Sequence, residues 1–383
     1  MVSEQLLEGP RGRRACLEWA LACEQRLIDQ GLEEMRGDSL NSAVFSLPDP
    51  AYRGAVVIAV PIGCEGENGC EDEAADPGMF AEETTARDVA RALGHVAVVE
   101  PDAGQALTVL ADVCAHAAYW QPPYAEDVAA SDPEVRAGLA RMAAALVAGP
   151  ATRWWSDGVD SRNQWLTRAV PRPEWGSTDV PDAREPRDPA EVLATWRRAV
   201  ADEEEQFRTW AAQDPGHMVG GPWWSTPPHG LAASTRALPG RLPLGVLCVE
   251  DGGWGRVVGR SLEVPESARV LEIDGPEDWA HLCREHPLDV SWSRRSDWLA
   301  ATGRDGRWVI PDWSAVARHV DGVHLSVRGY LRTAGRAIAV DEERASVLAG
   351  WDPDRTFWFC PTRTGDDLLT WEECEEEPGW RRA

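Results

Sequence analysis

The hydrophobic positions of this chain change their spacing along its length, and the change predicts where helices and strands lie. Residues 13–36 carry leucine, isoleucine and methionine mostly on one face at helical spacing, which predicts an amphipathic helix. Similar or alanine-rich patterns predict three further helices, at 81–93, 103–119 and 133–148. Short apolar runs predict strands at 43–47, 55–62 and 96–100. The pattern therefore favours a mixed α/β domain over residues 1–150.

The middle of the chain is expected to be a connection followed by a long helix. Residues 151–220 begin with a stretch rich in Trp, Pro and Asp, and a helical apolar stripe then runs over 188–212. Asp188 and Pro189 stand where a capping residue and a first-turn proline belong. Because the Gly- and Pro-containing segment 214–222 stops the helix, we place the main domain boundary there.

The C-terminal half has the densest succession of short apolar runs. Strands are predicted at 244–250, 270–273, 288–292, 308–310, 323–327, 337–340 and 356–360. We expect residues 221–362 to form a second α/β domain, so that the whole chain has a mixed α+β fold of two domains. The glutamate-rich segment 363–383 is expected to be an acidic tail exposed to solvent.

One sequence pattern occurs twice in the predicted C-terminal domain. Residues 270–292 and 308–327 each contain a strand, an Asp-Trp pair, a short helix and a second strand. The pairs are Asp278-Trp279 and Asp312-Trp313. The two units either form opposite walls of a pocket, or each Asp caps its helix while each Trp packs that helix on a sheet.

A second pattern pairs tryptophan doublets with later arginines. Trp-Trp-Ser stands at 154–156 and again at 223–225, and a Thr-Arg pair follows each copy. Tryptophan stacks planar rings and arginine binds anions, so these loops are candidate ligand-binding segments, although packing also explains them. The ligand-binding candidates are Trp154, Trp155, Arg168, Trp223, Trp224, Ser225, Thr226 and Arg236.

The candidate catalytic residues lie on one predicted strand. His324 alternates with the apolar residues Val323 and Leu325, and Ser326 and Arg328 follow at the same alternation. The three side chains are therefore expected to form one polar stripe on a single face of the strand. The alternative is an ordinary solvent-exposed strand face.

Charge narrows the classes of partner. The formal net charge is −26, and all 38 basic residues counted as Lys+Arg are arginine. A chain this acidic is repelled by nucleic acid and by anionic membrane surfaces. Neither is therefore expected as a partner. A small molecule or a basic protein remains, and the sequence leaves the oligomeric state open.

Cysteine usage and the amino-terminal sequence predict a cytoplasmic protein. The 9 cysteines have no disulfide framework, which is typical of reduced thiols. No apolar leader segment follows the first charges, and the longest apolar run is far shorter than the ~20 residues of a membrane helix. We find no glycine-rich phosphate loop, no nucleophile elbow and no zinc-site spacing, so no metal site is predicted and the cofactor is unknown.

These residues favour binding of a planar, phosphate-bearing small molecule, such as NAD or another nucleotide, in a cleft lined by Trp and Arg. The order of Arg236, hydroxyl-bearing loops and a late strand resembles the layout of ADP-ribosyltransferases over about 221–345. That resemblance implies a transferase activity. The chain departs from the family's pattern at the catalytic glutamate, because the matching strand contains Asp321-Gly-Val-His324.

The alternative is a protein without enzymatic activity. A tryptophan-rich, acidic chain suits an inhibitor, immunity or effector-binding protein whose partner is basic. In that case the segment 150–230 is the expected contact surface. Exposed tryptophans in the doublets would favour this alternative, and a closed pocket containing His324 and Arg328 would favour an enzyme.

Overall fold

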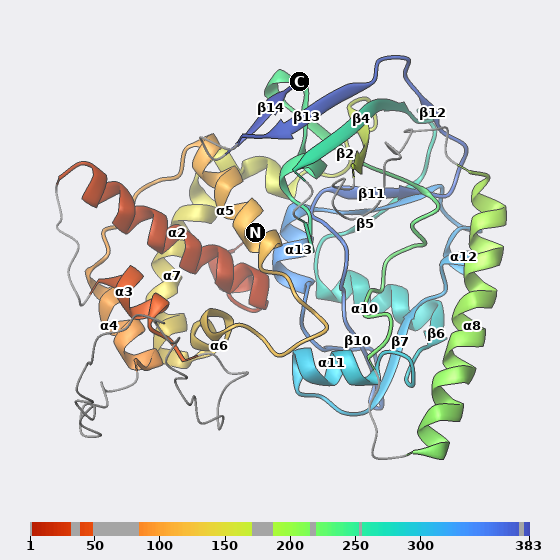
Figure 1. Ribbon diagram of the computed structural model, residues 1–383, viewed down its shortest axis with the longest axis horizontal. Helices are drawn as coiled ribbons and strands as arrows, with labels where there is room; N and C mark the ends of the chain where they lie inside the picture. The colour runs from red at the N-terminus through yellow and green to blue at the C-terminus, as the bar shows by residue number, and fades with distance from the viewer. Residues whose placement is uncertain are drawn as a thin grey trace, which may run out of the picture.

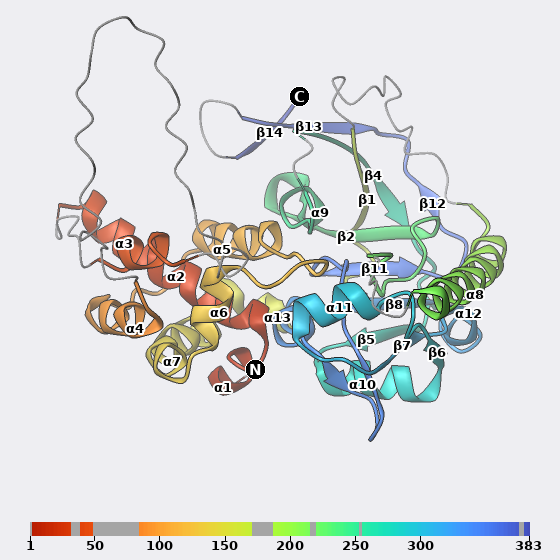
Figure 2. The ribbon, with the colours of Figure 1, turned by 60° about the horizontal axis from the view of Figure 1, so that its bottom comes forward.

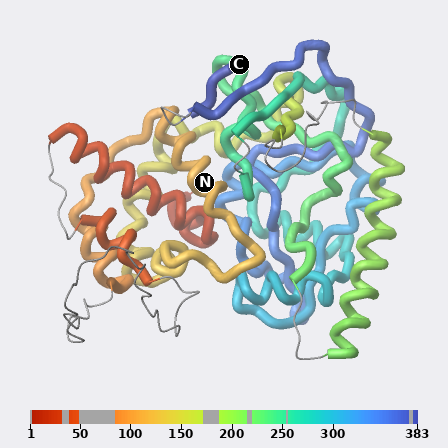
Figure 3. Tube along the Cα trace, in the orientation of Figure 1, coloured from red at the N-terminus to blue at the C-terminus, as the bar shows by residue number. Residues whose placement is uncertain are grey.

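The structure, a computed structural model, has a helical N-terminal region and two mixed sheets in its C-terminal part (Figure 1). It describes residues 2–31, 39–48, 84–170, 187–214, 220–252, 255–374 and 379–383. The chain passes from the helices into the sheets, and its two parts lie side by side (Figure 3). One buried hydrophobic cluster runs through both parts. The expected domain boundaries remain a prediction, and the core is continuous across them.

The described part of the N-terminal region contains only helices. They are α1 (Ser3–Leu6), α2 (Pro10–Asp29), α3 (Leu40–Phe45), α4 (Ala86–His95), α5 (Ala103–Ala115), α6 (Ala125–Ser131) and α7 (Pro133–Ala148). Helix α2 is central and contacts α5, α6 and α7. Its Glu24 is buried and accepts hydrogen bonds from the backbone N–H groups of Leu40 and Asn41, which fixes the start of α3.

Two of the strands expected in this region are wrong, and the third lies outside the described residues. The run 43–47 falls largely in α3, because the Ser39 side chain accepts a hydrogen bond from the Ser42 N–H and starts a helix there. The run 96–100 has no regular structure. A strand needs a neighbouring strand to satisfy its backbone, and the described N-terminal residues include none. The predicted strand 55–62 is not among the described residues.

The connection contributes a central strand to the larger sheet. After the 3₁₀ helix η2 (Pro150–Ser156), strand β1 (Gln164–Ala169) pairs with β2 (Ala232–Leu238) on one side and β4 (Arg256–Glu263) on the other. Helix α8 (Pro189–Gln213) confirms the predicted helix, and the Asp188 side chain caps it at the Ala190 N–H. Figure 2 shows α8 on the outer edge of the C-terminal part, beside α12 (Trp313–Val316).

The remaining elements complete two sheets. After β2 come η4 (Pro239–Arg241), β3 (Leu242–Pro243), α9 (Leu244–Leu247), β5 (Val270–Ile273), α10 (Pro276–Glu285), β6 (Pro287–Asp289), α11 (Arg295–Thr302), β7 (Arg307–Pro311), β8 (Gly322–Leu325), α13 (Val327–Thr333), β9 (Ile338–Ala339), β10 (Arg344–Ser346), β11 (Arg355–Trp358), β12 (Arg363–Thr364), β13 (Leu369–Glu373) and β14 (Trp380–Arg382). The main path of the larger sheet is β14-β13-β4-β1-β2-β11-β8-β5, and the smaller sheet is β6-β7-β10-β9.

Six of the seven strands predicted in this half are present, and one is wrong. Strand β5 has the predicted bounds, and the other five have altered ends. The run 244–250 begins with helix α9 instead of a strand. The backbone N–H of Gly245 donates to Thr235 Oγ1 at 2.9 Å, and a Cβ at Gly245 would lie 2.9 Å from Thr167 Oγ1. A single apolar turn therefore packs closely on β2, and periodicity does not distinguish such a turn from a buried strand.

The prediction that residues 363–383 form a solvent-exposed tail is also wrong for the described residues. Strand β13 pairs with β4, and Trp371 on β13 is 3% exposed. Its ring packs against Trp165 of β1, with ring centroids 6.0 Å apart. Leu369 and Trp371 alternate with polar residues, so the segment buries one face and leaves its charges on the other.

The repeated Asp-Trp pattern belongs to the core. Trp279 and Trp313 are fully buried, with ring centroids 6.1 Å apart, and Asp312 caps α12. Strands β5 and β8 are parallel neighbours in the larger sheet, whereas β6 and β7 are antiparallel neighbours in the smaller sheet. Each unit therefore connects the two sheets, and its Trp is buried in the main core, which confirms the packing part of the interpretation. The capping part is confirmed for Asp312 and is wrong for Asp278, because Gly275 stands at the N-cap of α10 and Asp278 accepts from the Asp274 N–H instead.

No helix in the part of the chain that the structure describes is both long enough and apolar enough to cross a membrane.

Candidate functional site

His324 lies between two carboxylates on β8, next to the edge strand β5 of the larger sheet. Its partners across the ladder are Glu272 on β5 and Thr356 on β11. Its Nδ1 is 2.5 Å from Glu272 Oε2, and its Nε2 is 3.3 Å from Asp354 Oδ1. The residue is 1% exposed. Burial alone would lower the pKa of His324, but hydrogen bonds to Asp354 and Glu272 outweigh burial and raise it.

Asp354 joins His324 to Arg236 and Trp154. The Arg236 Nε donates to Asp354 Oδ1 at 2.7 Å, and the Arg236 backbone N–H donates to Asp354 Oδ2 at 2.9 Å. The Arg236 guanidinium lies 5.2 Å from the centre of the Trp154 ring. Glu272, His324, Asp354, Arg236 and Trp154 thus form one connected set, which we call the His324 network.

The charges of the His324 network compensate one another. Arg236 binds Asp354 and also donates through Nη2 to the Gly158 carbonyl at 3.1 Å, so its guanidinium is largely occupied. Glu272 is the ionisable member that reaches solvent, with a side chain 38% exposed. Its Oε1 accepts a hydrogen bond from the Val159 N–H at 2.9 Å. The network therefore holds the loop around 157–160 against the sheet.

Ser326 and Arg328 do not continue the stripe expected from His324. Strand β8 ends at Leu325, and the Ser326 side chain caps α13 by accepting from the Gly329 N–H. Ser326 Oγ donates to Asp274 Oδ1 at 2.5 Å, and Arg328 Nε donates to the same oxygen at 2.7 Å. The prediction of a single polar strand face is wrong, because a helix starts directly after Leu325. His324 belongs to one carboxylate cluster, and Ser326 with Arg328 to another.

The two tryptophan doublets have separate surroundings. Trp155 is 1% exposed and belongs to the main core, while Trp154 stacks on Arg236. Trp223 packs against Trp120, with ring centroids 4.7 Å apart. Its partner Trp224 lies beside it, with centroids 5.9 Å apart.

The hydroxyl-bearing and arginine candidates also lie in separate surroundings. Ser225 and Thr226 are buried, and Ser225 Oγ accepts from the Ala349 N–H at 3.0 Å. Arg168 is exposed on β1. Of the candidates, the structure therefore brings together Trp154, Arg236 and His324, and it places the others elsewhere.

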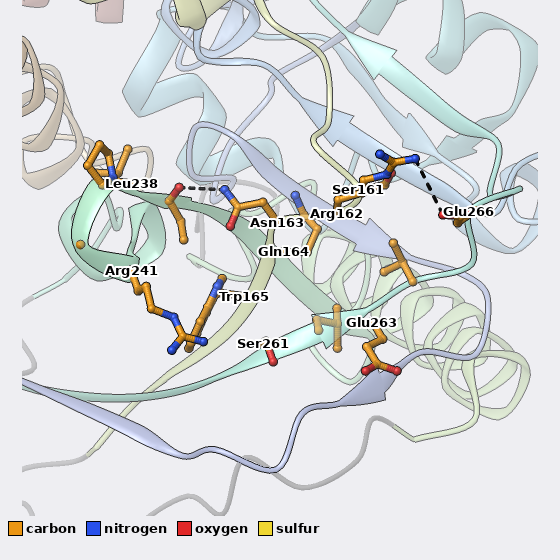
Figure 4. Close-up of a pocket in the computed structure, with 15 residues that line it drawn as sticks. Ser161, Arg162, Asn163, Gln164, Trp165, Leu238, Arg241, Ser261, Glu263 and Glu266 are labelled. Atoms are coloured by element: carbon orange, nitrogen blue, oxygen red, sulfur yellow. Dashed lines mark hydrogen bonds and ion pairs between the residues drawn. The ribbon is translucent and has the colours of Figure 1, made fainter.

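A pocket of about 850 Å³ lies along β1, β2 and β4 of the larger sheet (Figure 4). The segment leading into β1, the turn after β2 and the end of β4 form it, and we call it the sheet pocket. Trp165 and Arg241 lie together on one side, with the guanidinium 5.4 Å from the centre of the ring. Arg162 and Glu266 pair at 3.8 Å on another side. Ser161, Asn163 and Ser261 add hydrogen-bonding groups to the lining.

The position of Arg241 depends on an unusual backbone. Its φ is 64°, in the left-handed region, and the preceding Gly240 has φ 80°. Left-handed backbone disfavours side chains with a Cβ and is common at ligand sites, where the surrounding structure maintains it. The turn thereby places the guanidinium against Trp165.

The His324 network supports the wall of the sheet pocket. Gly158 and Val159 bind Arg236 and Glu272, and the next residues of the same loop, Ser161 and Arg162, line the pocket. On β2, Arg236 belongs to the network and the following Ala237 belongs to the lining. Removing the network is therefore expected to move the wall.

Glu272, Asp354 and Arg241 were not among the residues predicted from the sequence. Glu272 is a lone acid inside the apolar run Val-Leu-Glu-Ile, which was a usable signal. Asp354 and Arg241 lie in turns, where charged residues are ordinary. Nothing in the spacing of these residues indicates that they approach His324 or Trp165.

Among the described residues, no group of three or more His, Cys, Asp or Glu side chains is arranged to hold a metal ion. The sequence matches no protein-family model, and searches of curated proteins and of solved structures likewise give no match. The candidate site is therefore defined by its geometry alone.

Proposed function

We propose that the C-terminal sheets bind a planar, phosphate-bearing small molecule of the nucleotide class, such as NAD, in the sheet pocket. The pocket volume of about 850 Å³ lies within the usual range of ligand sites, roughly 300–1,000 Å³. Arg162 and Arg241 provide cations for a phosphate group, while Ser161, Asn163 and Ser261 provide hydrogen bonds for a sugar. The Arg241 guanidinium, held over the buried Trp165 ring, provides a planar surface for a base.

The observation that carries the proposal is the left-handed Arg241 stacked on Trp165 at the pocket. Such a backbone persists only where neighbouring contacts maintain it, and it is concentrated at functional sites. The exposed Arg241 has no carboxylate within ion-pair distance among the described residues. Its charge is therefore available to a ligand, unlike that of Arg236.

The His324 network acts in this proposal as a support for the pocket wall. His324 is almost fully buried, and each of its ring nitrogens faces a carboxylate. Glu272, the exposed member, is not part of the pocket lining. The proposal is accordingly one of ligand binding, and we assign no transferase step to these residues.

The test is a titration of the protein with NAD, ATP and AMP, followed by tryptophan fluorescence. We expect saturable quenching that Arg241→Gln weakens at least tenfold, because a charge-assisted contact is lost. The matched control is Arg304→Gln, since Arg304 stacks on Trp308 at 4.8 Å outside the pocket. Equal affinity in both variants, or no saturable response to any nucleotide, would contradict the proposal.

A second candidate function is the binding of a basic protein partner. No doublet tryptophan is fully exposed, but Trp210 on α8 is 41% exposed and Trp292 is 38% exposed. The Phe207 and Trp210 rings pack together with centroids 5.0 Å apart. Glu204 on the same helix accepts a hydrogen bond from the backbone N–H of Trp292. An aromatic surface beside carboxylates suits a basic peptide. Loss of arginine-rich peptide binding on replacing both tryptophans by Ser would favour this candidate.

A further inference from the structure

A second cavity lies between the N-terminal helices and the C-terminal part. It has a volume of about 240 Å³, and we call it the interface cavity. One side comes from the start of α2 and from the chain around Tyr119 and α6. The other side comes from the end of α11 and from residues 335–337, which follow α13. Its lining shares no residue with the sheet pocket.

The lining concentrates positive charge in a protein whose net charge is −26. Arg11, Arg13 and Arg336 all line the interface cavity. Asp127 also lines it, but its Oδ2 binds Arg11 Nη2 at 2.8 Å, and its Oδ1 lies 3.7 Å from Arg14 Nη1. Asp127, the buried carboxylate of the lining, is therefore already shared by two guanidinium groups, and the other carboxylate of the lining, Glu8, is exposed.

Arg13 and Arg336 have no carboxylate within ion-pair distance among the described residues. Arg13 donates hydrogen bonds through Nη1 to the carbonyls of Leu7 and Glu8. Arg336 makes no hydrogen bond to a described residue. Burial, and repulsion by Arg136, Arg336 and Arg11, lower the pKa of Arg13 to about 10. The cavity thus holds cations that repel one another.

Three buried N–H groups of the lining arginines also lack an acceptor. They are Arg11 Nε, Arg13 Nε and Arg336 Nη1. Arg11 itself is 4% exposed, so water does not readily replace the missing partner. Buried donors without acceptors are rare in folded proteins, and guanidinium groups fit tetrahedral and planar oxyanions through paired N–H groups.

We propose that the interface cavity binds a small phosphate-bearing anion, held by Arg13 and Arg336 with Arg11 behind them. The phosphate oxygens accept from the unpartnered N–H groups and offset the repulsion among the guanidiniums. A volume of about 240 Å³ leaves room beside the phosphate for a short carbon body against Pro10, Pro123 and Ala337. Because Arg13 lies on α2 and Arg336 follows α13, the bound anion links the helices to the sheets.

The test uses inorganic phosphate as the probe and Arg336→Gln as the variant. Arg336 is chosen because its removal breaks no hydrogen bond or ion pair to a described residue. We expect phosphate at constant ionic strength to raise the Tm of the unaltered protein saturably, and Arg336→Gln to weaken that response at least tenfold. Without phosphate the variant is expected to be as stable as the unaltered protein or more stable, since repulsion is relieved.

Two matched variants make the result decisive. Arg87→Gln removes a guanidinium that is 79% exposed and is not part of the cavity lining, so its phosphate response should be unchanged. Arg208→Gln on α8 removes a second exposed guanidinium that lines neither pocket, so it should also leave the response intact. A phosphate response that is absent, or that Arg336→Gln keeps in full, would overturn the inference. Stabilisation by acetate and not by phosphate would overturn the phosphate class.

Discussion

At the scale of single residues, His324 is a titratable group placed where water is almost excluded, with its pKa raised by two carboxylates. Taking a cation out of water is unfavourable unless opposite charges replace the lost hydration. Glu272 and Asp354 provide these charges on the two ring nitrogens, and Arg236 balances Asp354 in turn. The imidazole therefore makes a larger contribution to stability when it is protonated.

Replacing His324 with Gln should destabilise the protein in a pH-dependent way. The pKa of His324 is raised in the folded protein, so its contribution is complete below the unfolded value of about 6.5 and is lost as pH rises through the folded pKa. We expect a loss of about 3–5 kcal/mol at pH 6, because two carboxylates lose their partner, and a smaller loss at pH 9. Urea unfolding at both pH values measures it. A difference that does not change with pH would contradict a charged His324.

Individual residues also show how much of the candidate site could be predicted from the sequence. His324 was recognisable because a histidine stood between two buried apolar residues on a predicted strand. Its carboxylate partners were not recognisable, since Glu272 is 52 residues away and Asp354 is 30 residues away. Ser326 stood in the right place for a cap, but the helix that it starts was not predicted.

At the scale of elements, long periodic segments were predictable and short apolar runs were not. Helices α2, α7 and α8 cover several turns, so their spacing distinguishes helix from strand. The runs that became α3 and α9 cover one or two turns, and in such a length either conformation buries the same side chains. Tertiary packing decides between the two, as it does for Gly245 against β2.

Strand β13 provides a direct test at this scale. Trp371 is 3% exposed and packs with Trp165, Val246 and Val257 in a small core. Trp371→Ala should cost about 3–5 kcal/mol of unfolding free energy, because a large buried ring leaves a cavity. The control is Trp380→Ala on the edge strand β14, where the ring is less buried and the cost should be smaller. Equal, small costs in chemical denaturation would mean that the C-terminal segment does not support the sheet.

At the scale of the whole molecule, the candidate site forms only when distant segments meet. The sheet pocket uses chain from around 161, 238 and 262, so no local pattern could reveal it. The interface cavity needs the packing of α2 beside the chain that follows α13, a contact across the full length of the fold. Composition indicated that arginine and tryptophan side chains would form the site. The topology determines which of these residues contact one another.

The most direct measurement is the response of the tryptophan indole N–H signals to NAD in a nitrogen-15-labelled protein. The Trp165 signal is assigned from Trp165→Phe, and the buried Trp308, which also carries a stacked arginine, is the internal reference. We expect the Trp165 indole signal to shift saturably while the Trp308 signal stays in place. Shifts at Trp223 and Trp224 with Trp165 unmoved, or no shift at any indole, would contradict a nucleotide site in the sheet pocket.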